Sequence, residues 1–277
     1  MQTATAEKMI TTINLQPRIG SEVKTDPATM VSGAHAAEFR SLLEERGVLI
    51  FRDVDLNDEQ QLAFSATLGQ VARHGDRSPI QKITLDVNVD SAAEYLKGSL
   101  FWHIDGACDG VPNFAATLGA RRLPASGGET EFANTYAAWD DLPESEKASL
   151  EKLRVVHSLE TAQRVVYPQP SYAQVKAWQQ MPPRSQPLVW THKSGRKSLV
   201  LGCTASHVEG MSLEEGRLLL AKLLDWATQP QFVYTHEWKP GDVLVWDNTG
   251  TMHRVQPYDP AARLMHRTTL AGEEALA

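Results

Sequence analysis

The chain has few cysteines, no long apolar run and no excess of basic residues. Its only two cysteines, Cys108 and Cys203, cannot form a disulfide framework for 277 residues, so we expect a reducing cytoplasm. No run of about eighteen apolar residues is present to span a membrane, and residues 1–8 do not resemble a signal peptide. Lys and Arg number 27 against 34 Asp and Glu, a net charge of −7, which argues against nucleic acid and anionic membranes as partners.

Composition and the absence of dividing linkers predict one domain over residues 1–277. Apolar residues make up 42% of the chain and charged residues 22%, which is ordinary for a globular protein with a substantial core. No internal repeat and no linker rich in Pro, Gly or Ser divides it. We expect residues 1–18 to be a loose tail with an entering strand.

The spacing of apolar residues predicts many short strands and a few helices. Gly47 and Gly69 are expected to end the first two helices, and Ser212 with Glu215 forms a capping box before the last. The pattern favours a mainly β fold with flanking helices, a double-stranded β-helix or jelly roll. The expected helices are 35–46, 58–68, 136–142, 144–153 and 212–227, and the expected strands are 48–51, 83–89, 115–120, 242–247 and 267–270.

The segment 157–190 shows little regular period and is rich in proline and aromatic residues. Long irregular segments in compact domains are commonly lids or binding loops. Surface decoration packed by its own aromatics is the alternative. We expect a lid over an active site.

The most informative residues are His103 and Asp105, in Trp-His-Ile-Asp-Gly, together with the distant His253. On a strand, residues two apart project from one face, so His103 and Asp105 could bind one ion. Two imidazoles and a carboxylate on one face of a metal are typical of non-haem Fe(II) oxygenases, because the opposite positions stay open. Alone, His-x-Asp is a weak signal, and a core histidine with a turn aspartate would explain it.

Other motifs follow in a fixed order. They are Arg46-Gly-Val-Leu-Ile-Phe-Arg-Asp53, Pro124-Ala-Ser-Gly-Gly-Glu-Thr-Glu-Phe132, Pro240-Gly-Asp-Val-Leu-Val-Trp-Asp-Asn248 and Arg263-Leu-Met-His-Arg267. From about Ile19 to Gly272, this ordered set resembles the taurine dioxygenase/2,4-dichlorophenoxyacetate dioxygenase family. The resemblance implies a jelly roll with Fe(II) between two sheets, held by His103, Asp105 and His253. It also implies O2 and 2-oxoglutarate as co-substrates, with release of succinate and CO2.

The resemblance also assigns residues to the two organic ligands. Arg263 matches the family's 2-oxoglutarate arginine, and Thr130 matches the hydroxyl donor to the same carboxylate. A guanidinium suits a carboxylate because its paired N–H groups reach both oxygens. A surface arginine is the alternative reading of Arg263.

Arg267 and His74 match positions that bind the prime substrate in relatives. Arg267 lies four residues after Arg263, so on a strand both guanidinium groups would point into one cavity. A substrate carboxylate, sulfonate or sulfate would then pair with Arg267, unless an internal acid does so. His74 aligns through Leu-Gly alone and could equally be a loop residue. Leu100, Phe101, Val111 and the aromatics of 157–190 are the expected apolar walls.

Departures from the family pattern bear on the substrate. Ser99 and Gly202 stand where relatives commonly have asparagine, and no aromatic follows His74 closely. These changes disfavour taurine and favour a bulkier or more apolar substrate. Asp247 and Asn248 are expected to orient the metal ligands through the histidines' second nitrogens, with a turn-capping role for Asp247 as the alternative.

The sequence therefore predicts a cytoplasmic Fe(II)/2-oxoglutarate dioxygenase that hydroxylates a small anionic molecule and forms a homo-oligomer, a dimer or tetramer. A biosynthetic oxygenase that desaturates or rearranges an amino-acid-like substrate would use the same iron site. A jelly-roll binding protein without activity would have lost a ligand or Arg263. A zinc hydrolase would not need Thr130 or the arginine pair.

Overall fold

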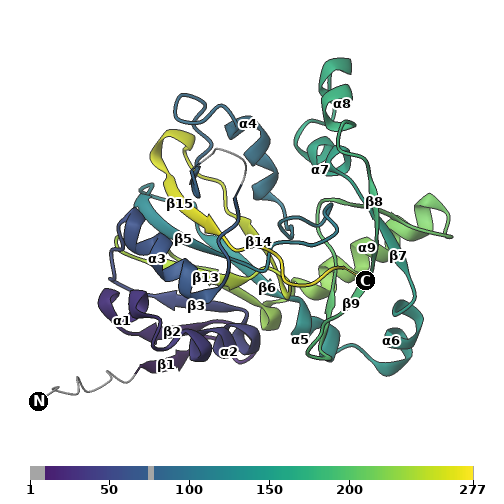
Figure 1. The fold of residues 1–277 in the computed structure, drawn as a ribbon. Helices are drawn as coiled ribbons and strands as arrows, with labels where there is room; N and C mark the ends of the chain where they lie inside the picture. The colour runs from purple at the N-terminus through teal and green to yellow at the C-terminus, as the bar shows by residue number, and fades with distance from the viewer. Residues whose placement is uncertain (1–9, 74–77, 277) are drawn as a thin grey trace, which may run out of the picture.

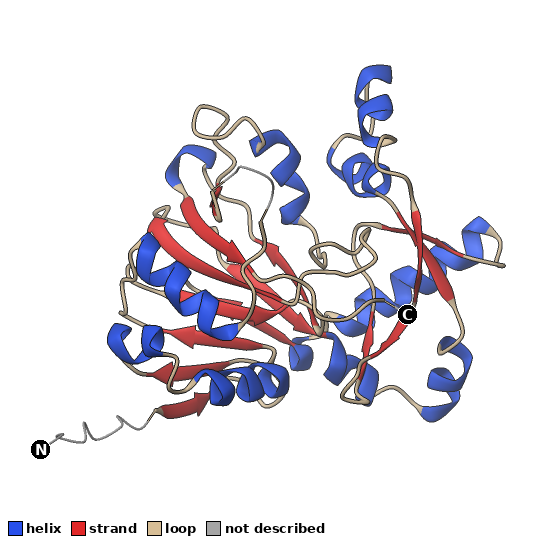
Figure 2. Ribbon diagram, in the orientation of Figure 1, coloured by secondary structure: helices blue, strands red, loops and turns tan. Residues whose placement is uncertain are grey.

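A computed structural model describes residues 10–73 and 78–276. Most of this part of the chain is arranged around one large sheet, drawn as red arrows in Figure 2, with helices on its outer face. Its neighbouring strands are antiparallel except for the parallel pair β2 and β3. In order across the sheet they are β1 (Thr11–Asn14), β2 (Ser21–Lys24), β3 (Val48–Phe51), β13 (Val243–Asp247), β5 (Ala115–Arg122), β15 (Leu264–Thr269) and β4 (Ile80–Ile83).

A second antiparallel sheet faces the inner side of the first. Its order is β12 (Val233–His236), β6 (Thr130–Asn134) and β14 (Thr251–Val255). Leu244 and Trp246 of β13 point into the core between the sheets, where the Trp246 ring lies 5.7 Å from that of Phe132. Val243 and Val245 point to the opposite side. Because β13 is covered on both faces, its sequence is continuously apolar rather than alternating.

Three N-terminal helices cover the outer face of the large sheet (Figure 1). They are α1 (Pro27–Ser32), α2 (Ala36–Arg46) and α3 (Asp58–Leu68). Phe39, Phe51 and Phe64 meet edge to face beneath them, with ring centroids 5.3–6.0 Å apart. Gly47 ends α2 with φ 72, a conformation that favours glycine.

The second half of the chain adds helices and two small sheets beside the two facing sheets. These elements are α5 (Thr135–Asp140), α6 (Glu144–Leu150), β7 (Arg154–His157), α7 (Leu159–Val166), α8 (Tyr172–Trp178), β8 (Arg184–Pro187), β9 (Val189–Thr191), β10 (Lys197–Leu199), β11 (Ala205–Val208) and α9 (Leu213–Ala227). The remaining short elements are α4 (Ala93–Leu96), η1 (Lys97–Leu100), η2 (Pro230–Phe232) and η3 (Pro260–Ala262).

Several sequence expectations are confirmed and others are wrong. The helices at 35–46, 58–68 and 212–227 form as predicted, and α9 has the expected capping box between Ser212 and Glu215. The strand expected at 83–89 is wrong, because β4 ends at Ile83 and the chain then turns, with the amide of Asn88 donating to the Asp86 carboxylate at 2.9 Å. The entering strand expected within 1–18 is confirmed as β1, and residues 1–9 of the expected tail lie outside the described residues.

The segment 157–190 is not irregular, because it contains α7, α8 and β8. Its proline and aromatic content hid the short helices, each of which begins at a serine cap, Ser158 or Ser171. In the described residues no helix is both long and apolar enough to cross a membrane.

Candidate metal centre and cavity

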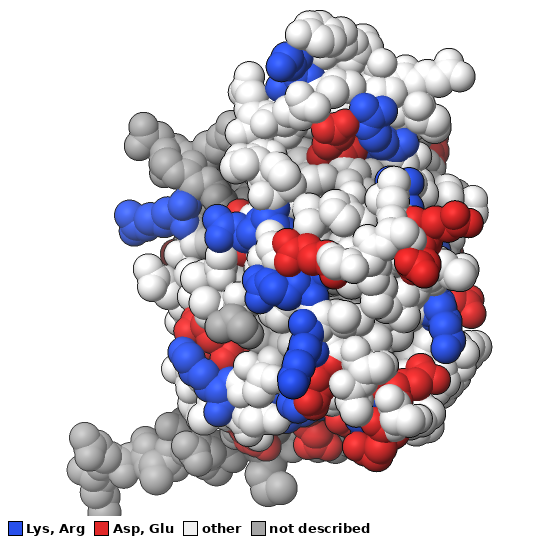
Figure 3. All heavy atoms as spheres, turned by 90° about the vertical axis from the view of Figure 1, so that its right-hand side faces the viewer, with Lys and Arg blue, Asp and Glu red and all other residues white. Residues whose placement is uncertain are grey.

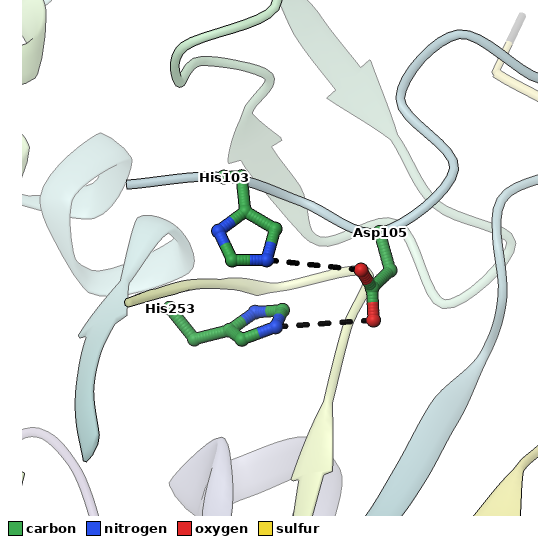
Figure 4. Close-up of side chains that lie close together, drawn as sticks. All are labelled: His103, Asp105 and His253. Carbon is green, nitrogen blue, oxygen red and sulfur yellow. Dashed lines mark ion pairs between the residues drawn. The ribbon is translucent and has the colours of Figure 1, made fainter. Parts of the chain in front are cut away.

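Backbone pairing brings His103 beside His253. Each residue's amide donates to the other's carbonyl, at 3.1 Å and 2.9 Å, in an isolated bridge that joins the loop after η1 to β14. The expectation of a strand through Asp105 is wrong, because Asp105 begins a turn. All three side chains nevertheless converge (Figure 4): Asp105 Oδ1 lies 3.7 Å from His103 Nε2, and Asp105 Oδ2 lies 3.8 Å from His253 Nε2.

This geometry fits a metal ion. One donor atom from each of the three residues lies within 4.8 Å of the others. Donors about 2.1 Å from one ion and at right angles would be about 3 Å apart, so they need to approach one another by at most ~2 Å. Among the described residues, this is the one group of three or more His, Cys, Asp and Glu side chains with such spacing.

The surroundings set the protonation of the ligands. His103 Nδ1 lies 2.8 Å from the Phe101 carbonyl, so this nitrogen carries the proton and Nε2 is left as the metal donor. Burial, with repulsion from His103, lowers the pKa of His253 well below its usual value, which favours the neutral imidazole. Burial opposes ionisation of Asp105, but Arg267 and the two histidines lower its pKa to about 2.

Asn248 positions Asp105 through contacts with its backbone, which the sequence did not predict. Its Nδ2 donates to the Asp105 carbonyl at 2.8 Å and its Oδ1 accepts from the Asp105 amide at 2.9 Å. The expected contact with a histidine is wrong. Asp247 instead caps the turn before Gly250, accepting from the amide and hydroxyl of Thr249, as the alternative predicted.

Arg263 is a buried cation without an acidic partner. It is 2% exposed, its Nη2 donates to Thr130 Oγ1 at 3.3 Å, and its Nε has no partner. No carboxylate of the described residues forms an ion pair with it, and burial lowers the pKa of the guanidinium. An unpaired buried charge is costly, so this site fits the distal carboxylate of 2-oxoglutarate.

Arg267 pairs with an acidic residue of the protein, which is the alternative that the sequence left open. Its Nη1 donates to Asp105 Oδ2 at 2.9 Å, and Nε and Nη2 donate to Gln81 Oε1 at 3.1 and 2.8 Å. Arg263 lies just before β15 rather than on it, but both arginines line the same cavity. His74 lies outside the described residues.

One cavity of about 290 Å³ joins these groups, close to the lower limit of roughly 300 Å³ for small-molecule sites. Its lining contains the three metal ligands, Thr130, Arg263 and Arg267, and Ser99 as expected. The expected walls are wrong: neither Leu100, Phe101 nor Val111 lines it, and neither do the aromatics of 157–190. The apolar walls are instead Ile83, Leu96, Ile104, Ala107, Leu118, Leu159, Ala162, Met181, Trp246 and Val255.

Glycine in place of asparagine at position 202 suggested a larger cavity. The structure shows that Gly202 does not enlarge it. A Cβ at this position would lie 2.8 Å from the Trp102 carbonyl oxygen and 3.0 Å from His103 Cα, with φ at +114. Glycine therefore lets this loop pack directly on the backbone that holds a metal ligand.

Known proteins resemble this chain over nearly its whole length. The family model described as taurine catabolism dioxygenase TauD, TfdA family, matches residues 11–269. An alpha-ketoglutarate-dependent 2,4-dichlorophenoxyacetate dioxygenase of Burkholderia sp. (strain RASC) is 38% identical, covering 87% of both chains. An alpha-ketoglutarate-dependent sulfate ester dioxygenase of Pseudomonas putida is 31% identical, covering 94% of this chain and 84% of its own.

A solved structure shares the fold. AAD-2 in complex with Mn(II) and N-oxalylglycine has a TM-score of 0.84 and 35% identity, covering 98% of this chain and 100% of its own. The family match and the His-Asp-His centre agree with each other. The chain therefore belongs to the TauD/TfdA family, and it is an oxidoreductase that depends on Fe(II), 2-oxoglutarate and O2.

Proposed function

We propose that this enzyme hydroxylates a small organic substrate that has one anionic group and an apolar body, releasing succinate and CO2. In this proposal His103, Asp105 and His253 hold Fe(II), and Thr130 and Arg263 bind the distal carboxylate of 2-oxoglutarate. The observation that carries it is Arg263, a buried and unpaired guanidinium in the same cavity as three converging metal donors. We also assign the two facing sheets to a double-stranded β-helix and the chain to one domain.

The chain's own residues perform distinct tasks. Bound Fe(II) supplies the positions for 2-oxoglutarate and O2 and the oxidising chemistry. His103 keeps its proton on Nδ1 through the Phe101 carbonyl, so that Nε2 stays available. The apolar walls exclude water from the substrate's reacting carbon.

Arg267 is proposed to orient the substrate's anion. Three of its five N–H groups donate to Asp105 and Gln81, which leaves one on Nη1 and one on Nη2 for a ligand. The named relatives that act on 2,4-dichlorophenoxyacetate and on sulfate esters support an anionic substrate. Because Arg267 also pairs with Asp105, the substrate's anion would lie close to the metal.

A homo-oligomer and a cytoplasmic location stay predictions, as does the absence of nucleic-acid and membrane partners. On the face in Figure 3, acidic and basic side chains are interspersed rather than gathered by sign. A mixed surface of this kind does not favour a polyanion.

Anaerobic titration tests the metal and co-substrate roles first. Fe(II) with 2-oxoglutarate should give a weak visible charge-transfer band in the parent and none in His253→Ala or Asp105→Ala. A panel of aryloxyacetates, alkyl sulfates, taurine and neutral analogues, scored by succinate, then tests the substrate. A full band in either variant would contradict the metal site, and a neutral best substrate would contradict the anionic class.

Arg267→Leu tests the anchor directly. Turnover of an anionic substrate from the panel should fall by more than tenfold, while substrate-independent decay of 2-oxoglutarate persists. An unchanged KM for that substrate would mean that Arg267 serves only Asp105.

A further inference from the structure

Two segments far apart in the sequence form a roof over the cavity. The first is 93–100, containing α4 and η1, and contributes Tyr95, Leu96 and Ser99 to the lining. The second is 159–167, containing α7, and contributes Leu159, Ala162 and Gln163. In Figure 1 α4 and α7 lie above β14, the strand that carries His253.

Gln163 of α7 and Tyr167, the residue that follows the helix, hold the first segment. Gln163 is 3% exposed, and its Nε2 donates to the Tyr95 carbonyl at 3.3 Å. The Tyr167 hydroxyl donates to the carboxylate and to the carbonyl of Glu94. Both contacts reach consecutive residues of α4, so they form one clasp with a buried half and an exposed half.

Neighbouring groups hold the exposed half in place. Lys97 Nζ pairs with Glu94 at 2.8 Å and lies 5.9 Å from the centre of the Tyr167 ring. On the other side, Trp178 of α8 stacks on Tyr167, with centroids 6.2 Å apart and planes inclined by 26°. The tyrosine is thus oriented by its ring, and the hydroxyl alone makes the link to Glu94.

We propose that Gln163 and Tyr167 are positioning residues that clasp the roof, so that the prime substrate enters the cavity only when this clasp opens. This inference rests on the proposed function in assigning the cavity to a substrate. An exposed pair such as Glu94 and Tyr167 contributes little alone, so it can break and re-form readily. A buried Gln163 amide without a hydrogen-bond partner costs free energy. This cost favours the closed arrangement of the two segments.

The two cysteines report on the roof without any catalysis. Cys108 and Cys203 both line the cavity beneath it, and burial raises the pKa of their thiols to about 11 and about 12. The thiolate attacks one carbon of the N-ethylmaleimide double bond, a C–S bond forms as the π bond breaks, and the other carbon takes up a proton from water. Both thiols are partly exposed, so the parent labels at a basal rate, and the rate of each variant relative to the parent in the metal-free full chain measures how often the roof opens.

The variants separate the clasp from general loosening. Tyr167→Phe keeps the ring and removes the hydroxyl, and should label both cysteines three- to tenfold faster than the parent. Glu94→Ala should do the same, while Glu94→Gln keeps an acceptor and should restore the parent rate. Tyr172→Phe, the same change at a 78% exposed tyrosine of α8, is the matched control and should have no effect.

Two results would overturn the proposal. One is a parent-like labelling rate in Tyr167→Phe, and the other is an equal acceleration in Tyr172→Phe. For a substrate identified with the panel, Tyr167→Phe should change KM several-fold while kcat stays within twofold, and an unchanged KM would also contradict substrate gating. If the panel yields no substrate, the proposed function fails, whereas the labelling result still decides whether the clasp exists.

Discussion

Asn248 links the metal site to the backbone through both ends of its amide, which few other side chains could do. It is fully buried and contacts Asp105 as donor and acceptor, and it also donates to the Asn113 carbonyl at 2.9 Å. A side chain that touches no metal can therefore decide where a ligand lies.

We expect Asn248→Ala to weaken metal binding by about 10–100-fold, the usual effect of losing an outer partner of a ligand. Asn248→Asp keeps the acceptor but turns a carboxylate oxygen toward the Asp105 and Asn113 carbonyls, so its loss should be at least as large. Mn(II) titration measures both, with Asn88→Ala, in an exposed turn, as the control. Parent-like affinity in Asn248→Ala would refute the positioning role, provided that its unfolding temperature shows a folded protein.

Arg263 should matter to the co-substrate far more than to the prime substrate. Removing one partner of a buried pair costs about 3–5 kcal/mol, so Arg263→Ala should weaken 2-oxoglutarate binding by more than about a hundredfold. Arg263→Lys keeps the charge and loses the paired N–H groups, and should lie between. The visible band under anaerobic Fe(II) gives these affinities directly. Equal affinities in all three proteins would place the carboxylate elsewhere.

Gly202 should tolerate no side chain. Gly202→Ala would force a Cβ to within 2.8 Å of the Trp102 carbonyl oxygen and 3.0 Å of His103 Cα. We therefore expect lower metal affinity together with a loss of about 1–3 kcal/mol in the free energy of unfolding. Gly195→Ala is the control, since it also has positive φ but nothing within 4 Å. If both variants lost metal affinity equally, backbone strain rather than the clash with His103 would be the cause.

At the scale of elements, the sequence predicted those whose signals are local. Helices α2, α3 and α9 have apolar spacing and end signals within their own residues. The strand through Asp105 and the strand at 83–89 were wrong, because pairing across the chain decides which extended residues join a sheet. The bridge between His103 and His253 joins residues far apart in sequence, so local spacing could not predict it.

In the candidate site too, some features could be predicted from the sequence and others depend on packing. The family resemblance of the ordered motifs indicated the triad, Thr130 and Arg263, and these residues line one cavity. The pairing of Arg267 with Asp105 and the contacts of Asn248 with Asp105 depend on packing. The cavity walls were mispredicted for a related reason. Tyr167 and Trp178 pack on one another, Trp190 packs on His192 and Tyr172 is exposed, while smaller residues of α7 reach the cavity.

One element-scale prediction concerns α9. Ser212 caps this helix by accepting from the Glu215 amide at 3.3 Å, and Glu215 accepts from Ser212 in return. Ser212→Ala should lower the free energy of unfolding by about 0.5–2 kcal/mol. Metal affinity should not change, because α9 contributes no residue to the cavity lining. Urea unfolding with Ser149→Ala as a control checks the first part, and Mn(II) titration checks the second.

At the scale of the whole molecule, the site joins parts of the fold that share no local sequence. The loop after η1 supplies His103 and Asp105, β14 supplies His253, and Arg263 lies just before β15. Such a site exists only in the folded chain. Ligands that bind it must therefore stabilise the whole fold by mass action.

Mn(II) with N-oxalylglycine, a mimic of 2-oxoglutarate that does not react, should raise the unfolding temperature. At a hundredfold excess over its dissociation constant a ligand adds about 2.7 kcal/mol, and a domain of roughly this size gains about 2–4 °C per kcal/mol. The expected shift is therefore about 5–10 °C, measured by calorimetry. His253→Ala should lose the response to both ligands, because the mimic's chelating end needs the metal, while Arg263→Ala should keep the response to Mn(II) alone. A shift that survives in His253→Ala would show that the ligands bind elsewhere on the protein.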